Sequence, residues 1–189
     1  PRYQHAAIIL RSESAADGTS GALLVMGGLS GAPGDEVLGG RRRLAATDVT
    51  SLKLRERLGE GMHVLADVWR LGIGGNDGGV VRTWQRLQDR FPPTGEEPAR
   101  RFGHSIAGLP DGEVFLFGGR VVTETYVGAS RRAASLLYMS SDAWIFGGGR
   151  EGGGEWIPVR SKGGEGLWPA ARAFHACEAI GGALLIFGG

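Results

Sequence analysis

The chain has 189 residues, of which 42% are apolar, and its formal net charge at pH 7 is +1. This apolar content argues against disorder throughout the chain. The small net charge gives no indication of the basic surface by which many nucleic-acid-binding proteins are identified. Cys177 is the one cysteine, which excludes an intrachain disulfide and a Cys-x-x-Cys metal knuckle. No apolar run approaches the ~20 residues of a membrane span, and no signal peptide opens the chain. We therefore expect a cytoplasmic location.

Three segments of the same form recur along the chain. Each begins with Arg-x-x-His, continues with an apolar run, a turn and a second apolar run, and closes with two glycines. The second runs are residues 22–26, 114–117 and 183–187, and the glycine pairs are Gly27-Gly28, Gly118-Gly119 and Gly188-Gly189. Two apolar runs joined by a turn are typical of a β-hairpin.

Two further runs follow each of the first two glycine pairs. The third run carries Asp-x-Trp, at residues 66–73 and again at 141–148, and the fourth run carries a single tryptophan. Apolar and aromatic residues in short runs favour half-buried strands, so we expect four strands in each of two units. Residues 41–61 are the exception, because a loose stripe of apolar residues at helical spacing predicts a short helix there.

The order Arg-x-x-His, Gly-Gly, Asp-x-Trp and a later Trp resembles the kelch repeat, over nearly the whole chain except its insertions. The resemblance implies an all-β fold with four-stranded antiparallel blades of a β-propeller. We expect a first blade at 1–101 with an insertion at about 29–65, and a second at 102–172 with an insertion at about 120–140. Residues 173–189 would form the inner hairpin of a third blade. Such a partial propeller has open edges, so we expect further blades or neighbouring subunits at both.

The recurring polar, aromatic and glycine residues are predicted to be structural. Paired glycines allow a sharp turn close to a neighbouring blade, and tryptophans fill the space between blade faces. The aspartates are expected to accept backbone hydrogen bonds in a turn, and Arg-x-x-His to bind loops of the next blade. The structural set is Arg2, His5, Gly27, Gly28, Asp67, Trp69, Trp84, Arg101, His104, Gly118, Gly119, Asp142, Trp144, Trp156, Arg172, His175, Gly188 and Gly189.

The motifs predict no catalytic residue, metal or cofactor. Equivalent histidines in successive blades are rotated about the propeller axis, so they do not converge on one ion. Residues 147–152 satisfy G-x-G-x-x-G, but they lead into an expected strand rather than the helix that a dinucleotide site needs. Cys177 lies in an expected inner strand and is interpreted as a small buried apolar residue. The tyrosines and Cys177 do not match the site of copper radical oxidases resembling galactose oxidase.

The longest connections are predicted to emerge on one face of the blades and to be loops. Function in repeat folds resides in such loops, and arginine and tyrosine are favoured anchors of protein interfaces. The candidate partner-binding residues are Arg41, Arg42, Arg43, Tyr126, Arg131, Arg132 and Tyr138. For each of these residues taken singly, the alternative to a role in partner binding is a solvated position in a loop.

We therefore expect a non-catalytic scaffold for protein–protein interaction, part of a larger protein or of a multi-subunit assembly. A second hypothesis is the propeller domain of an enzyme whose catalytic domain lies elsewhere. It is motivated by "FLFGGR" and "SSDAWIF", which look like the kelch half of tRNA wybutosine-synthesizing carboxymethyl- and methyltransferases. Nucleic-acid binding through the arginines is a third hypothesis, weakened by the near-zero net charge.

Overall fold

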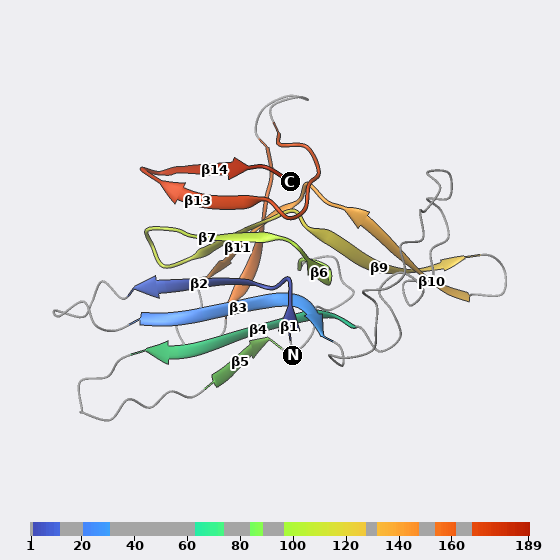
Figure 1. The fold of residues 1–189 in the computed structure, drawn as a ribbon, viewed down its shortest axis with the longest axis horizontal. Coiled ribbons are helices and arrows are strands. Elements are labelled where there is room, and N and C mark those ends of the chain that lie inside the picture. The colour runs from blue at the N-terminus through green and yellow to red at the C-terminus, as the bar shows by residue number, and fades with distance from the viewer. Residues whose placement is uncertain are drawn as a thin grey trace, which may run out of the picture.

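The structure, a computed structural model, describes residues 2–11, 21–30, 63–73, 84–88, 97–127, 132–147, 154–161 and 168–189. Over these ranges the chain forms fourteen strands in four antiparallel sheets and no helix (Figure 1). The prediction of an all-β chain is confirmed for this part, and none of the four sheets is closed into a barrel. The short helix expected at 41–61 lies outside the described residues.

Sheet 1 contains the first five strands. Their bounds are β1 (Arg2–Tyr3), β2 (Ala6–Arg11), β3 (Gly21–Ser30), β4 (His63–Ile73) and β5 (Trp84–Gln88). Strands β2 to β5 lie side by side in chain order, and β1 pairs with the far end of β3. The register of β3 against β4 shifts between Met26 and Gly28, where the glycine pair has positive φ. A bulge of this kind increases the local twist of the sheet.

Sheet 3 repeats the four-strand order of sheet 1, and sheet 4 is a hairpin. Sheet 3 contains β7 (Ser105–Gly108), β8 (Val114–Phe117), β11 (Ala143–Gly147) and β12 (Glu155–Val159). Sheet 4 contains β13 (Ala176–Ile180) and β14 (Ala183–Phe187). The turn between β7 and β8 is closed by a hydrogen bond from the Gly112 amide to the Leu109 carbonyl, with Gly112 at a φ of 84°.

Sheet 2 contains β6 (Arg101–Phe102), β9 (Arg120–Val127) and β10 (Arg132–Met139). β9 and β10 form a long hairpin ladder, so the connection at about 120–140 is not the loop that we expected. Backbone bonds from the Val122 amide to the Arg100 carbonyl and from the Ser140 amide to the Gly119 carbonyl anchor its base. The run Val-Val-Thr in β9 is rich in β-branched residues, which favour strands, and Val121 and Val122 are buried.

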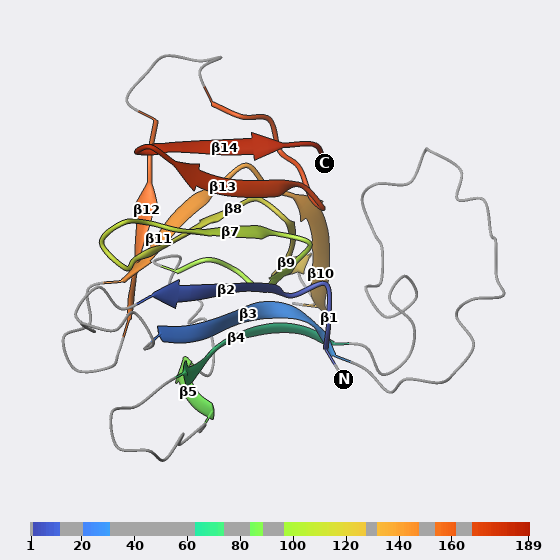
Figure 2. The same ribbon diagram turned by 60° about the vertical axis from the view of Figure 1, so that its left-hand side comes forward.

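Sheets 1, 3 and 4 stack face to face in chain order, which Figures 1 and 2 show from two directions. One face of sheet 3 packs against sheet 1 through Leu116 and Trp144, which join the core cluster containing Met26 and Val68. Phe115 and Phe117 belong to the cluster with Cys177 and Ile186 of sheet 4. Because neighbouring side chains of a strand point to opposite faces, the continuous apolar run in β8 is explained by burial on both sides.

Candidate functional site

A bidentate ion pair joins Arg101 of β6 to Asp142, the residue just before β11. The Nη1–Oδ1 and Nη2–Oδ2 distances are both 2.7 Å, and Arg101 is 1% exposed. Asp142 also accepts hydrogen bonds from Ser140 Oγ at 2.7 Å and Trp144 Nε1 at 2.8 Å. Burial disfavours the charged carboxylate, but the hydrogen bond and charge of Arg101, with the bonds from Trp144 and Ser140, hold the pKa of Asp142 below its usual value.

These bonds correct the role expected for Asp142. The hydrogen bonds that Asp142 accepts come from side chains, not from backbone amides of a turn. Arg101 Nη1 donates at 2.9 Å to the carbonyl of Gly118, which lies in the segment 102–172 that was expected to form the next blade. Asp67 of sheet 1 likewise accepts a bond from Trp69 Nε1 at 2.6 Å.

Arg172 makes the same carbonyl contacts as Arg101. Arg101 donates through Nε to the Ala99 carbonyl and through Nη1 to the Gly118 carbonyl. Arg172 donates through Nε to the Ala170 carbonyl at 3.1 Å and through Nη1 to the Gly188 carbonyl at 2.9 Å. In both segments the guanidinium therefore holds the first glycine of the pair that closes its own hairpin.

The histidines pack on the glycine pair of the preceding sheet. A Cβ on Gly27 would lie 3.1 Å from His104 Cε1 and 3.0 Å from the Arg101 carbonyl oxygen. A Cβ on Gly118 would lie 3.1 Å from His175 Cε1 and 2.7 Å from the Arg172 carbonyl oxygen. Both glycines have positive φ, 53° and 62°, so close approach and backbone conformation each exclude a side chain.

The position before each histidine has left-handed backbone, which the sequence did not reveal. Gln4, Gly103 and Phe174 have φ values of 53°, 62° and 61°. Backbone bonds link them in series: the Gly103 amide donates to the Gln4 carbonyl at 3.1 Å, and the Phe174 amide donates to the Gly103 carbonyl at 2.7 Å. Of the three residues, only glycine adopts this conformation without cost. The residue type is therefore consistent with left-handed backbone at Gly103 but gives no indication of it at Gln4 and Phe174.

Two of the histidines, His104 and His175, are buried beside positively charged arginines. Desolvation by burial, helped by the positive charge of Arg101, lowers the pKa of His104 to about 3. Desolvation and the charge of Arg172 also lower the pKa of His175. In the described part of the chain, no group of three or more His, Cys, Asp or Glu side chains is placed to hold a metal ion.

A Ser–His pair lies between sheets 3 and 4. Ser105 Oγ is 2.6 Å from His175 Nε2, and each residue is 8% exposed. Burial raises the pKa of the half-buried Cys177 thiol, against the opposing effect of a hydrogen bond with Ser105. A reactive thiol needs a lowered pKa and access to solvent, so the geometry gives these three residues a packing role between the sheets.

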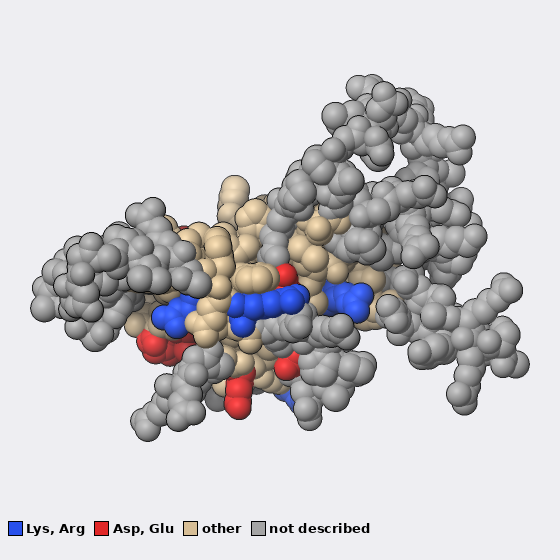
Figure 3. Space-filling model, turned by 90° about the horizontal axis from the view of Figure 1, so that it is seen from below, with Lys and Arg blue, Asp and Glu red and all other residues tan. Residues whose placement is uncertain are grey.

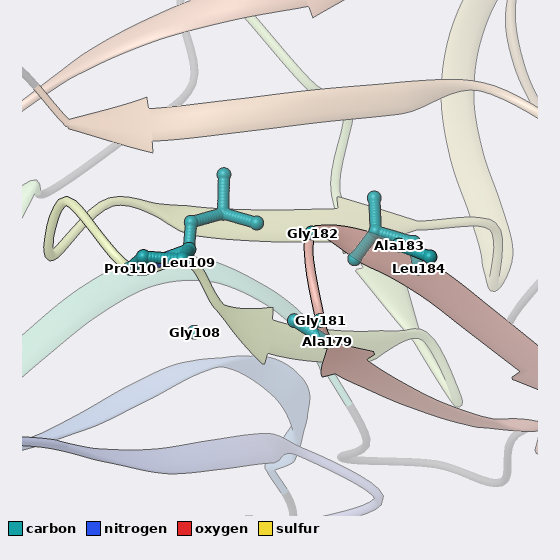
Figure 4. Close-up of a pocket in the computed structure, with 8 residues that line it drawn as sticks. All are labelled: Gly108, Leu109, Pro110, Ala179, Gly181, Gly182, Ala183 and Leu184. Carbon is teal, nitrogen blue, oxygen red and sulfur yellow. The ribbon is translucent and has the colours of Figure 1, made fainter.

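Among the described residues, two hollows on the stack have mainly apolar linings. A cavity of about 260 Å³ separates the turn of the β7–β8 hairpin from the turn of the β13–β14 hairpin (Figure 4). It is lined by Gly108, Leu109, Pro110, Ala179, Gly181, Gly182, Ala183 and Leu184. A second hollow of about 460 Å³ lies on the face of sheet 1 turned away from sheet 3 and is lined by His5, Val25, Trp69 and Trp84. Neither lining combines a nucleophile with a base.

The candidate partner-binding residues divide between described and undescribed parts of the chain. Arg41, Arg42, Arg43 and Arg131 lie outside the described residues. Tyr126 and Arg132 lie near the same end of the β9–β10 ladder, where their partners are Ala133 and Val127. Tyr138, opposite Val121, lies near the other end and is 48% exposed. The structure therefore places three candidates on one hairpin but does not bring them into one cluster.

Charged side chains are mixed on the face seen from below in Figure 1. Figure 3 shows basic groups in a short row, with acidic groups beside them and uncharged surface between. Proteins that bind nucleic acid through charge present a basic patch or stripe. On this face the basic groups are interrupted by acidic and uncharged groups, so they do not form a continuous basic patch.

Comparison with known proteins assigns no family. No protein-family model matches the chain, and no curated protein matches its sequence. Among the described residues, no helix has the length and apolar character needed to cross a membrane.

Proposed function

We propose that this chain is part of a kelch-type β-propeller that acts as a non-catalytic scaffold for protein–protein interaction, in a larger protein or a multi-subunit assembly. The stacking of sheets 1, 3 and 4 supports the propeller interpretation, because blades of a propeller pack face to face around an axis. The matched contacts of Arg101 with Arg172 and of His104 with His175 also support it. Each blade would position the next through the same few bonds.

The β9–β10 hairpin carries the proposal of a docking function. It extends from the stack, away from the β7–β8 and β13–β14 turns (Figure 1). Tyr138 and Met139 near its base are 48% and 54% exposed, while backbone bonds at Val122 and Ser140 hold it to the stack. An anchored hairpin with an exposed aromatic residue offers a preorganised surface, and preorganisation lowers the entropic cost of binding.

The enzyme hypothesis is compatible with the same surface. In that case the propeller would be the non-catalytic domain of a longer polypeptide, and the hairpin would bind the catalytic domain. The resemblance to the kelch half of the wybutosine-synthesizing enzymes is what favours this alternative.

Affinity capture from cells tests the proposal with two variants. The hairpin variant combines Tyr126→Ala, Arg132→Ala and Tyr138→Ala, and the control is Ile157→Ala, which removes an equally exposed apolar side chain from β12. We expect a partner that the wild type and the control retain and the hairpin variant loses, followed by direct binding of the purified partner. Retention of every partner by the hairpin variant would contradict the proposal, and salt-sensitive RNA binding would favour the nucleic-acid hypothesis.

A further inference from the structure

Two opposite faces of the stack present exposed apolar side chains. The front face is the side of sheet 1 turned away from sheet 3, and the rear face is the side of sheet 4 turned away from sheet 3. We infer that two copies of this chain associate head to tail, with the front face of one copy stacked on the rear face of the other. This inference does not depend on the proposed docking hairpin.

The front face holds an aromatic hollow. His5, Val25, Trp69 and Trp84 line it, and its volume is about 460 Å³. Trp84 is 47% exposed, and Ile9 on the same side of the sheet is 63% exposed. Trp144 and Trp156, which occupy the same places in sheet 3, are each 8% exposed because sheet 1 covers them.

The rear face is equally uncovered. Phe187 is 82% exposed, Ile180 58% and Leu185 56%. The side chains in the same hairpin positions of sheet 3 are Phe115 and Phe117, which are 4% and 0% exposed beneath sheet 4. A group of adjacent exposed apolar residues marks an interaction surface more often than it marks ordinary protein surface.

A second copy fits the rear face because the chain already forms this type of interface twice. In each instance an incoming histidine lies against the first glycine of the preceding sheet: His104 against Gly27, and His175 against Gly118. Gly188 is the corresponding glycine of sheet 4, and no atom lies within 4 Å of its Cβ position. His5, which is exposed on the front face, is the histidine that a second copy would place there.

The backbone offers the same continuation. The Gly103 amide binds the Gln4 carbonyl, and the Phe174 amide binds the Gly103 carbonyl. The next bond in this series would run from the Gln4 amide of the second copy to the Phe174 carbonyl of the first. The Arg172 carbonyl accepts a bond from the Gly119 amide at 2.9 Å, and the Arg2 carbonyl of the second copy would accept one from the Gly189 amide.

These contacts commit the interface to a head-to-tail form. The front face carries the histidine and the two tryptophans, while the rear face carries the glycine and the hairpin residues Ile180, Leu185 and Phe187 together with the exposed Glu178. The two faces therefore differ, and neither is complementary to itself. Such a heterologous contact leaves one face free on each partner and leads to a ring or an open chain of copies.

Sedimentation velocity of the 189-residue chain over a concentration series tests the inference. We expect the weight-average sedimentation coefficient of the wild type to rise with concentration. Phe187→Glu on the rear face and Trp84→Glu on the front face are each expected to remain monomeric alone. An equimolar mixture of the two variants is expected to form a one-to-one dimer, because each retains the face that the other has lost.

Ile157→Glu is the matched control, because Ile157 is 51% exposed on β12 and belongs to neither face; it is expected to associate like the wild type. If Phe187→Glu loses its β-sheet circular dichroism, Leu185→Glu replaces it as the rear-face variant. If Trp84→Glu loses it, Ile9→Glu replaces it as the front-face variant. A wild type that stays monomeric overturns the inference and leaves the hollow to a small ligand or a peptide. Association that survives both face variants, or a mixture that forms no dimer, also overturns it.

Discussion

Arg101 and Asp142 are joined by two parallel hydrogen bonds, each 2.7 Å long, although Arg101 lies in β6 and Asp142 lies far along the chain, just before β11. The guanidinium also binds the Gly118 carbonyl, so one buried side chain connects the Arg-x-x-His segment, the glycine pair and the Asp-x-Trp strand. The three motifs of the sequence therefore meet at this residue. Charge-assisted bidentate pairs are the strong class of protein hydrogen bond.

Arg101→Ala is expected to lower the free energy of unfolding by about 3 kcal/mol, since it leaves a partly buried carboxylate without the positive charge that pairs with it. Arg172→Ala is the matched control, because the bonds shown for Arg172 go to two carbonyl oxygens in an exposed setting. Its loss is expected to cost about 1 kcal/mol. Urea unfolding monitored by tryptophan fluorescence measures both values, and equal losses would contradict a special role for the Arg101–Asp142 pair.

Gly118→Ala is expected to destabilise the chain much more than Gly188→Ala, although both glycines occupy the same place in their hairpins. At Gly118 the new Cβ would lie 2.7 Å from the Arg172 carbonyl oxygen, whereas at Gly188 it would meet no atom within 4 Å. Both positions have positive φ, so an alanine at either one would carry a strain of about 1 kcal/mol. At position 118 overpacking by the new methyl group would add about 2 kcal/mol. Thermal unfolding of dilute protein checks the difference, and equal midpoints would contradict it.

Buried His104 is expected to make the stability depend on pH between about 6.5 and about 3. In this window the unfolded chain binds a proton at His104 that the folded chain does not, so the free energy of unfolding falls as pH falls. The slope from this one group is on the order of 1 kcal/mol per pH unit. Urea titrations at several pH values should show the slope in the wild type and a reduced slope in His104→Gln.

The exposed His5 provides the control for this experiment, because His5→Gln leaves His104 in place and is expected to preserve the slope. The carboxylate of Asp142 acts at lower pH: its pKa is depressed in the folded chain, so the stability it contributes is present above its unfolded pKa and is lost as pH falls through the folded value. A slope above pH 5 that is unchanged in His104→Gln would refute the assignment to His104.

The Phe174 ring occupies the space that a side chain at position 103 would need, which predicts energetic coupling between these two positions. A Cβ on Gly103 would lie 2.7 Å from the Phe174 ring, and the Arg120 guanidinium lies over the same ring, 5.5 Å from its centroid. Gly103→Ala is expected to cost about 2 kcal/mol in the wild type and about 1 kcal/mol less in a Phe174→Ala background, where the ring is absent. A double-mutant cycle measures this difference, and strictly additive effects would exclude the contact as the cause.

The sequence was sufficient to predict the strands that belong to the recurring motifs. It was insufficient to predict the structural features that depend on contacts between distant segments. Val114–Phe117 and Ala143–Gly147 were recognised because apolar runs and Asp-x-Trp recur at matching places. The β9–β10 ladder lies in the extra length between the second and third strands of its unit, which predicts a loop, whereas the β-branched residues of β9 favour a strand. The left-handed backbone of Gln4 and Phe174 is imposed by hydrogen bonds between distant segments, which no local pattern encodes. The Arg101–Asp142 pair is a long-range contact of the same kind.

Cys177 is expected to react slowly with thiol reagents while the chain is folded. Burial raises the pKa of its thiol, and its contacts with the Phe115–Phe117 cluster limit access; the thiolate is the reacting form. At pH 8 the native chain should be modified more slowly than the urea-unfolded chain, because the raised pKa lowers the fraction of thiolate in the folded chain. Ser105→Ala, which removes a hydrogen bond that lowers this pKa, is expected to slow the native reaction further without changing the unfolded rate. Native and unfolded rates that agree would place the thiol in solvent and contradict the packing of sheet 4 on sheet 3.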